Sequence, residues 1–360
     1  MADCAQGFES LTPRARTDAA LFRETPMSCR ARYGSDRAFE ATAQSGRRYE
    51  IGDAAAPPLA AGVAVNPIDP DLWRSKASPH DDCNQMNSTD FLVTRRPQLA
   101  AIKQFPEVKF ANYERRLAEL QATLQRVQQA YLGTSHRAII VLEGWDTAGK
   151  GGVVRRLGWA LDPRSFKVHA IAAPTRREKS RHYLQRFWER LPENGQIVVF
   201  DRSWYGRVLV ERVEAYATPT EWRRAYNEIN EFEQMLLEDN TRLAKIFLHI
   251  TPEEQMRRFR ARLTDPLKRW KLSYEDFRNR ARWKDYEVAI EDMFETTSTD
   301  RASWYLVPAN NKPFSRLAAF RIIADRLSKN VALQPPALDS KVVEAAEQLL
   351  GTRVPSENRC

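Results

Sequence analysis

The sequence predicts an α/β fold in three layers, with a central parallel sheet and helices on both of its faces. Three observations lead to this fold class. Short apolar runs alternate with stretches of helical period from about residue 110 onward. A glycine-rich loop directly follows the first apolar run, and an aspartate follows a later one. Both features are typical of the carboxyl edge of a parallel sheet, where such folds bind ligands.

The elements follow from the period of the apolar residues. Apolar runs predict strands at 138–142, 167–172, 197–200, 244–250 and 304–307. Apolar residues three and four positions apart predict helices at 113–131, 151–161, 180–191, 221–240 and 314–327. Two helix starts are especially clear. Thr218 and Thr251 each precede a proline and, three positions on, a glutamate that can complete a capping box.

The composition indicates a globular protein with a polyanionic partner. Of the 360 residues 42% are hydrophobic, which is enough for a sizeable core, and the formal charge is +9. The four cysteines have no spacing that suits zinc or a disulfide framework: Cys4, Cys29, Cys83 and Cys360. No apolar run reaches the length of about 18 residues that a membrane span needs, and no secretory signal is evident. We therefore expect a cytoplasmic protein.

The chain divides into three parts by pattern. Residues 1–90 have no sustained period and include a linker-like stretch at 54–62, so we expect a disordered N-terminal extension. Residues 91–330 carry the alternating strands and helices and form the predicted catalytic domain. Residues 331–360 are a C-terminal tail for which a helix is one expectation.

The segment between the first strand and the next helix is a predicted phosphate loop. Gly144 and Gly149 let backbone N–H groups converge on one point, Lys150 adds a cation, and Gly151 opens the helix. The usual pattern places serine or threonine after the lysine to help hold Mg²⁺, and here that position is Gly151. Asp146, inside the loop, looks like the replacement for the missing hydroxyl.

A second group of candidate residues follows the third predicted strand. Asp201 ends this strand, and an acid there can hold Mg²⁺ beside the phosphate loop. Arg202 and Arg207 could then face phosphate oxygens. The alternative is that Asp201 only caps the following helix and that both arginines are solvated.

A basic tract after the fourth strand resembles a lid. Arg258 and Arg262 share one helical face, and the Asp265-Pro266 pair predicts a hairpin of helices at about 253–285, which also carries Lys271. A cationic element of this kind could close over a phosphate site and exclude water. A solvated helical surface with local ion pairs is the alternative for each of these cations.

Several motifs together resemble the polyphosphate kinase 2 family. The resemblance rests on the runs 142–152, 200–213 and 269–272, and also on 171–175, 228–233 and 296–299. It covers about residues 110–327, with the motifs in the family's order. The details look most like the branch whose members include tandem-domain enzymes that phosphorylate AMP, whereas this chain has one such domain.

The resemblance implies a P-loop kinase fold and Mg²⁺-dependent phosphoryl transfer between inorganic polyphosphate and a nucleotide, with Mn²⁺ as a possible substitute. It also implies a homodimer or homotetramer. It assigns metal roles to Asp146 and Asp201. It assigns phosphate roles to Lys150, Arg202, Arg207, Arg258, Arg262 and Lys271.

Two other functions stay open from the residues themselves. The phosphate loop would serve an ATP-dependent nucleotide or small-molecule kinase of the same fold equally well. The basic tract could bind nucleic acid. Because the sequence shows no recognised nucleic-acid module and no membrane segment, we expect neither nucleic acid nor a membrane as a partner.

Overall fold

The computed structural model describes residues 86–102, 105–108, 110–334, 338–351 and 353. All of these belong to the compact unit Val63–Cys360. Most of the predicted N-terminal extension, including the linker-like stretch at 54–62, lies outside the described residues. A short 3-10 helix, η2 (Ser88–Phe91), crosses the predicted boundary of that region at residue 90.

A five-stranded sheet forms the centre, with strand order β2-β3-β1-β4-β5. Every neighbouring pair is parallel. The strands are β1 (Arg137–Gly144), β2 (Phe166–Ala170), β3 (Ile197–Asp201), β4 (Thr241–His249) and β5 (Trp304–Pro308). β1, β3 and β4 are buried along almost their whole length, as expected for strands covered on both faces. The α/β prediction with a parallel sheet is confirmed.

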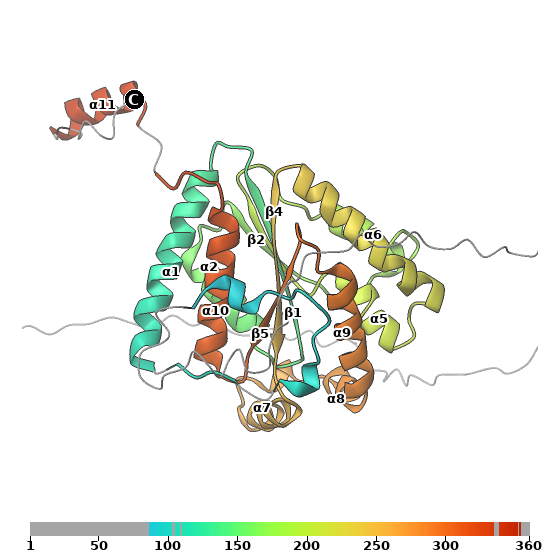
Figure 1. Ribbon diagram of the computed structural model, residues 1–360. Coiled ribbons are helices and arrows are strands. Elements are labelled where there is room, and N and C mark those ends of the chain that lie inside the picture. The colour runs from blue at the N-terminus through green and yellow to red at the C-terminus, as the bar shows by residue number, and fades with distance from the viewer. Residues whose placement is uncertain (1–85, 103–104, 109, 335–337, 352, 354–360) are drawn as a thin grey trace, which may run out of the picture. The chain divides into compact units, whose positions relative to one another are not determined.

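Helices form the two outer layers (Figure 1). α1, α2 and α10 cover one face of the sheet, and α5, α6 and α9 cover the other. The helices are η2 (Ser88–Phe91), η3 (Leu99–Ala101), α1 (Phe110–Tyr131), α2 (Lys150–Ala160), α3 (Arg176–Lys179), α4 (Gln185–Trp188), η4 (Trp204–Arg207), α5 (Val210–Val213), α6 (Pro219–Glu238), α7 (Pro252–Thr264), η5 (Arg269–Lys271), α8 (Tyr274–Ala281), α9 (Trp283–Thr297), α10 (Lys312–Ser328) and α11 (Ser340–Leu350).

Both predicted threonine caps are present, and the capping box is complete at Thr218, whereas the Glu254 carboxylate pairs with Arg257 and Arg258. The hydroxyls of Thr218 and Thr251 accept the backbone N–H groups of Glu221 and Glu254, which opens α6 and α7. The predicted break at 265–266 is also present, because α7 ends at Thr264 and α8 begins only at Tyr274.

The predicted helix at 180–191 is wrong. Of the described helices, the short α4 (Gln185–Trp188) lies in this range, and α3 (Arg176–Lys179) ends just before it. The Ser180 hydroxyl bonds the carbonyl of Arg177, which gives the backbone a local alternative to the helix. Leu184 and Phe187 are buried at the start and middle of α4, so packing favours a new helix start there.

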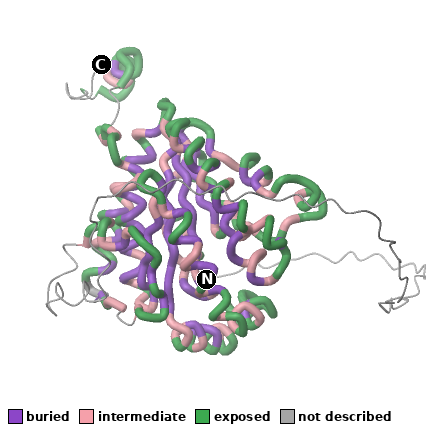
Figure 2. Tube along the Cα trace, turned by 45° about the vertical axis from the view of Figure 1, so that its right-hand side comes forward, coloured by how far each residue is buried: buried purple, intermediate pink, exposed green. Residues whose placement is uncertain are grey.

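The core lies on the sheet, as the buried colour along the strands shows (Figure 2). One charged pair is buried within it. Lys245 of β4 bonds Glu233 of α6 at 2.7 Å, and both are inaccessible to solvent. The Tyr205 hydroxyl donates to Glu233 and accepts from Lys245. This network fixes the segment after β3, and with it the edge of the sheet that carries Asp201.

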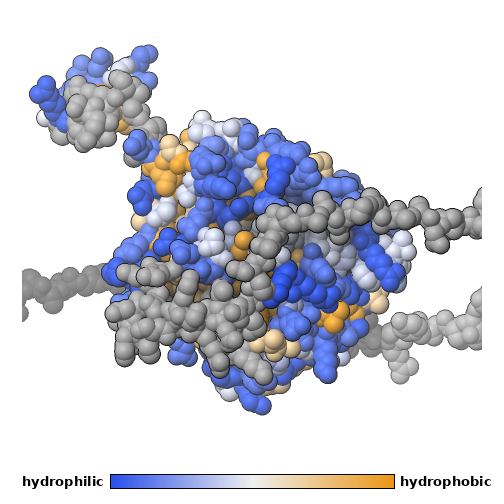
Figure 3. Space-filling model, in the orientation of Figure 1, coloured by the Kyte–Doolittle hydropathy of each residue, from blue (hydrophilic) through white to orange (hydrophobic). Residues whose placement is uncertain are grey.

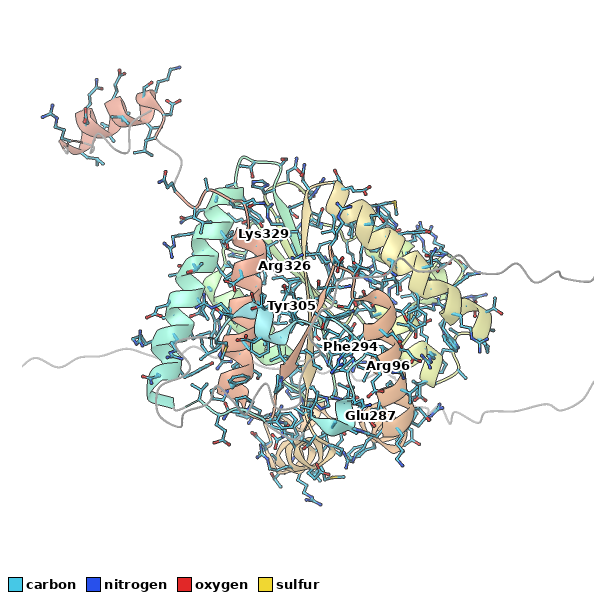
Figure 4. All side chains as sticks on the ribbon, in the orientation of Figure 1. Arg96, Glu287, Phe294, Tyr305, Arg326 and Lys329 are labelled. Carbon is cyan, nitrogen blue, oxygen red and sulfur yellow. The ribbon has the colours of Figure 1, made fainter. Side chains whose placement is uncertain are left out.

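The segment before α1 packs along β5. The Val93 N–H donates to the Trp304 carbonyl at 2.9 Å, and Leu92 forms an antiparallel bridge with Tyr305. Arg96 then pairs with acidic residues of α9, beside which Figure 4 shows it. The segment therefore covers an edge of the sheet that would otherwise be open.

The described surface in Figure 3 is mostly hydrophilic, with small apolar groups between the polar ones. Of the helices that the structure describes, none combines the length and the apolar character that crossing a membrane requires.

Candidate active site

The phosphate loop connects β1 to α2 and depends on its glycines. Gly144 has a φ of 144°, and a Cβ there would lie 2.6 Å from the Leu248 carbonyl oxygen of β4. Gly149 has a φ of 123°. Side chains are excluded at Gly144 by contact and strained at both positions by φ, so the two glycines permit the loop's path. At Gly151, by contrast, a Cβ would meet nothing within 4 Å.

Lys150 closes the loop on itself. Its ammonium donates to the carbonyl oxygens of Gly144 at 2.6 Å and Trp145 at 3.2 Å. Burial lowers the pKa of Lys150, and the charge of Arg202 lowers it further, while nearby carboxylates, including Asp146 and Asp201, raise it. The cation thus stands among the predicted metal-binding acids, at the base of the loop.

Asp146 is held by two protein donors. Arg202 donates to one carboxylate oxygen at 2.7 Å, and Asn279 of α8 donates to the other at 2.9 Å. Gln255 of α7 donates to its backbone carbonyl at 3.2 Å. The loop acid is therefore tied to the strand end at Arg202 and to both helices of the predicted lid.

Asp201 stands at the neighbouring strand end, since it pairs in register with Leu142 of β1. Its charge acts on Lys150, Arg202 and Glu143. Within the described residues its carboxylate accepts no hydrogen bond. Arg202, which follows it, has a φ of 65°, a strained conformation for a residue with a side chain. This turn directs the Arg202 guanidinium back to the loop acid.

Arg258 occupies a different place from the one predicted. It is only 3% exposed, and it donates to the carbonyl oxygens of Thr147, Ala148, Ala309 and Asn310 and to Glu254. Its guanidinium therefore braces the phosphate loop against the segment after β5. A phosphate contact for Arg258 is not supported by this geometry.

Three other predicted cations contact residues outside the phosphate loop or are exposed. Arg207 pairs with Glu211 at 3.2 Å and stacks on the Tyr183 ring at 4.6 Å. Arg262 donates to the carbonyl oxygen of Lys271 at 3.4 Å, which joins α7 to η5. Lys271 is exposed. The structure thus brings Asp146, Lys150, Asp201 and Arg202 together and leaves Arg207, Arg262 and Lys271 outside this group.

Sequence reasoning assigned no role to three residues that hold the site. Buried Glu143 accepts from the Ser203 hydroxyl at 2.8 Å, and burial raises its pKa. Asn279 bonds Asp146, and the Trp283 ring stacks on Trp145 at 3.6 Å. Glu143 could have been noticed as an acid ending an apolar strand. The helix residues carry no signal in the sequence.

An open cleft lies beside the loop. Trp145 forms part of its wall. Its indole N–H donates to His249 at 3.0 Å and its ring stacks on Trp283, so two contacts fix the ring. The lining combines apolar and aromatic side chains with polar ones. Its residues are Glu143, Gly144, Trp145, Asp146, Arg202, Gly206, Leu209, Val210, Phe247, Gln255, Asn279, Arg280, Trp283, Tyr286 and Ile290. A cleft of this kind suits a small ligand with one flat apolar part.

The donor set fits a hard divalent cation. In the described part of the chain, no cluster of three or more His, Cys, Asp or Glu side chains could hold a metal by itself. Asp201 supplies a carboxylate at the end of β3, and Asp146 supplies one from the loop that follows the adjoining strand β1. Mg²⁺ is typically bound by one or two carboxylates together with substrate phosphates, so two acids beside a phosphate loop match its needs.

A model of the polyphosphate kinase 2 family matches residues 107–334. The chain belongs to this family. The resemblance predicted from the motifs is thereby confirmed.

Relatives include a polyphosphate:AMP phosphotransferase of Acinetobacter johnsonii, which is 44% identical over 64% of this chain and 48% of its own length. The ADP-polyphosphate phosphotransferase 3 of Rhizobium meliloti is 40% identical over 66% of this chain and 84% of its own. The chain spans about half the length of the polyphosphate:AMP phosphotransferases that it matches.

Solved structures agree with the fold. The crystal structure of polyphosphate kinase 2 from Arthrobacter aurescens TC1 has a TM-score of 0.67 and 34% sequence identity. The match covers 74% of this chain and 98% of that one. The predicted P-loop kinase fold is therefore confirmed.

Proposed function

We propose that this protein transfers a phosphoryl group between inorganic polyphosphate and a nucleotide, converting AMP to ADP, ADP to ATP, or both. The observation that carries the proposal is the group formed by Asp146, Lys150, Asp201 and Arg202 at the carboxyl edge of the sheet. Membership of the polyphosphate kinase 2 family supports the choice of donor. Guanine nucleotides are further candidate acceptors.

The residues would act by position and charge. The loop amides and Lys150 would hold donor phosphates, which compete with the Gly144 and Trp145 carbonyls for the ammonium. Asp146 and Asp201 would hold Mg²⁺ or Mn²⁺, which when bound neutralises phosphate charge. An oxygen of the acceptor's own phosphate is the nucleophile. It forms the new P–O bond while the bond to the rest of the donor breaks, so no protein nucleophile is required.

The hairpin of α7, η5 and α8 is the candidate lid. Asn279 and Gln255 contact Asp146 from its two helices, while Arg262 and Lys271 lie farther along it. Closure would bring these two cations toward the transferring phosphate and exclude water. Arg207 keeps its predicted phosphate role only if its pairing with Glu211 opens.

An acceptor panel tests the proposal. The purified protein receives polyphosphate, Mg²⁺ and one of AMP, ADP, GMP or GDP, with ATP absent, and the products are separated by ion exchange. We expect the next higher phosphate of at least one nucleotide. Products that form only when ATP replaces polyphosphate would instead identify an ATP-dependent kinase of the same fold.

Assembly and location remain predictions. A homodimer or homotetramer is expected, and light scattering coupled to gel filtration measures it. Binding to nucleic acid or to a membrane is not expected. A cytoplasmic location accords with the nucleotide substrates that we propose.

A further inference from the structure

Four aromatic rings from separate segments contact one another in a row beside the phosphate loop. Phe105, before α1, stacks on His249 with 5.8 Å between the ring centroids. His249 ends β4, and its Nδ1 accepts the indole N–H of Trp145 at 3.0 Å. Trp145 in turn stacks on Trp283, the first residue of α9, with 3.6 Å between the rings and an angle of 5°. We call these four residues the ring series.

His249 accepts a hydrogen bond from a group that can only donate. Because the Trp145 indole has no acceptor, the His249 Nδ1 is the unprotonated nitrogen of a neutral ring. His249 is 3% exposed, and burial lowers its pKa to about 4, which keeps the ring neutral at neutral pH. Trp145 is also buried, so its N–H would lose its partner inside the protein if this acceptor were absent. The hydrogen bond therefore fixes which edge of the indole faces β4.

Two routes lead from the ring series to the carboxylate of Asp146. The first is the chain itself, because Trp145 directly precedes Asp146 in the loop. The second passes through the start of α9. Trp283 stands four positions after Asn279, whose side chain donates to the Asp146 carboxylate at 2.9 Å. A fixed Trp145 ring thus holds the junction of α8 and α9, and with it one of the two donors that orient Asp146.

We propose that His249 is a positioning residue, which orients Asp146 for metal binding by holding the Trp145 indole against Trp283. The inference rests on the metal role of Asp146 in the proposed function. In the described part of the chain, the His249 ring forms no hydrogen bond with Asp146 or Asp201 and does not line the cleft. Its effect on the site therefore passes through Trp145.

Substitutions at position 249 separate the hydrogen bond from the packing. His249→Phe keeps a ring against Phe105 but offers no acceptor, whereas the amide oxygen of His249→Asn can accept near the position of Nδ1. The matched control is His136→Phe. His136 precedes β1 at the amino end of that strand, and its Nδ1 also lies beside a donor, the Arg242 guanidinium, at 3.1 Å. Thermal unfolding checks that each variant is folded.

Metal binding is measured with Mn²⁺ alone, from the electron paramagnetic resonance signal of the free ion. Asp201→Asn defines the binding that occurs elsewhere on the protein. We expect His249→Phe to lose about tenfold in Mn²⁺ affinity, and His249→Asn and His136→Phe to stay within about twofold of the wild type. In a Trp145→Phe background, His249→Phe should cause no further loss, because the hydrogen bond is already absent there.

The indole N–H of Trp145 gives a readout that needs no metal. In ¹⁵N-labelled protein its resonance is assigned by its absence in Trp145→Phe. It should shift in His249→Phe and stay near its wild-type position in His249→Asn and His136→Phe. Because neither measurement includes a nucleotide, a protein that proves inactive with every acceptor still gives an answer about His249.

Several results would overturn the role of His249. These are an unchanged Mn²⁺ affinity in His249→Phe, an equal loss in His249→Asn, and an equal further loss in the Trp145→Phe background. An indole resonance that His249→Phe does not move would also refute it. If His249→Phe does not fold, Trp145→Phe replaces it, and wild-type Mn²⁺ affinity in that variant contradicts the proposal. Wild-type protein that binds no more Mn²⁺ than Asp201→Asn would instead refute the metal site itself, and with it any orientation of Asp146 for a metal.

Discussion

The phosphate loop and the tip of the α7–α8 hairpin are held in opposite ways. Buried Arg258 and half-buried Lys150 donate to the loop's carbonyl oxygens, so the loop has its shape before any phosphate arrives. At the tip, Leu267 is 83% exposed and Trp270 78% exposed, and the Trp270 indole donates to the Leu267 carbonyl oxygen. Few contacts would be lost if the tip moved, which makes it the part of the site suited to closing.

The difference between the two regions begins within α7 itself. Gln255 and Arg258, near its start, bond the loop, whereas Arg262, one turn later, bonds the Lys271 carbonyl within the hairpin. A helix can thus belong to the rigid part at one end and to the movable part at the other. Substitutions along it can show where the boundary lies.

The largest expected effect is at the strand end that the loop faces. Asp201→Asn should lower turnover by several orders of magnitude while the melting temperature stays the same, because the amide keeps the shape but cannot carry the charge that a metal needs. Steady-state kinetics and thermal unfolding measure the two. Asp300→Asn, in an exposed turn, is the matched control. Activity near that of the control would refute the metal role of Asp201.

The next effect tests the boundary within α7. Arg258→Met should reduce the free energy of unfolding by about 3–5 kcal/mol, because it leaves two loop carbonyls and the two carbonyls after β5 without their buried donor. Arg262→Met, one turn away, should change it by less than about 0.5 kcal/mol. Urea unfolding of the two variants gives the comparison. Equal losses would mean that the loop is no better anchored than the hairpin.

A smaller effect tests whether Asp146 replaces the missing hydroxyl. Gly151 has open space around its Cβ position, so a serine fits there. In an Asp146→Asn background, Gly151→Ser should recover about tenfold in activity and in apparent Mg²⁺ affinity. Gly158→Ser, farther along α2, should recover nothing. Equal recovery of activity by Gly151→Ser and Gly158→Ser would contradict the hypothesis that Asp146 takes the place of a hydroxyl at position 151.

The sequence predicts the sheet well because its strands are apolar runs bounded by clear helix caps. The strand ends, and with them Asp146, Lys150, Asp201 and Arg202, follow from that pattern, since the carboxyl ends of parallel strands meet at one edge. The prediction fails at 180–191, where the apolar spacing fits a helix of twelve residues but the Ser180 side chain bond to Arg177 and the packing of Phe187 favour a short helix that begins at Gln185.

The partners of the arginines could not be predicted in the same way. Arg258 has the spacing of a surface residue, yet it is buried because four carbonyl oxygens from two distant segments meet around it. Asn279 and Trp283 reach the loop only through the path of the hairpin, which no local pattern records. Long-range contacts of this kind follow from the fold as a whole.

The most direct test of the account is the balance between donor and acceptor. With ATP absent and Mg²⁺ present, the phosphate lost from long-chain polyphosphate is measured against the nucleotide phosphate gained, for the wild type and for Lys150→Ala. We predict one nucleotide phosphorylated for each phosphate lost, and neither change in the variant. Polyphosphate that is shortened without any gain in nucleotide phosphate would contradict phosphoryl transfer as the function of this site.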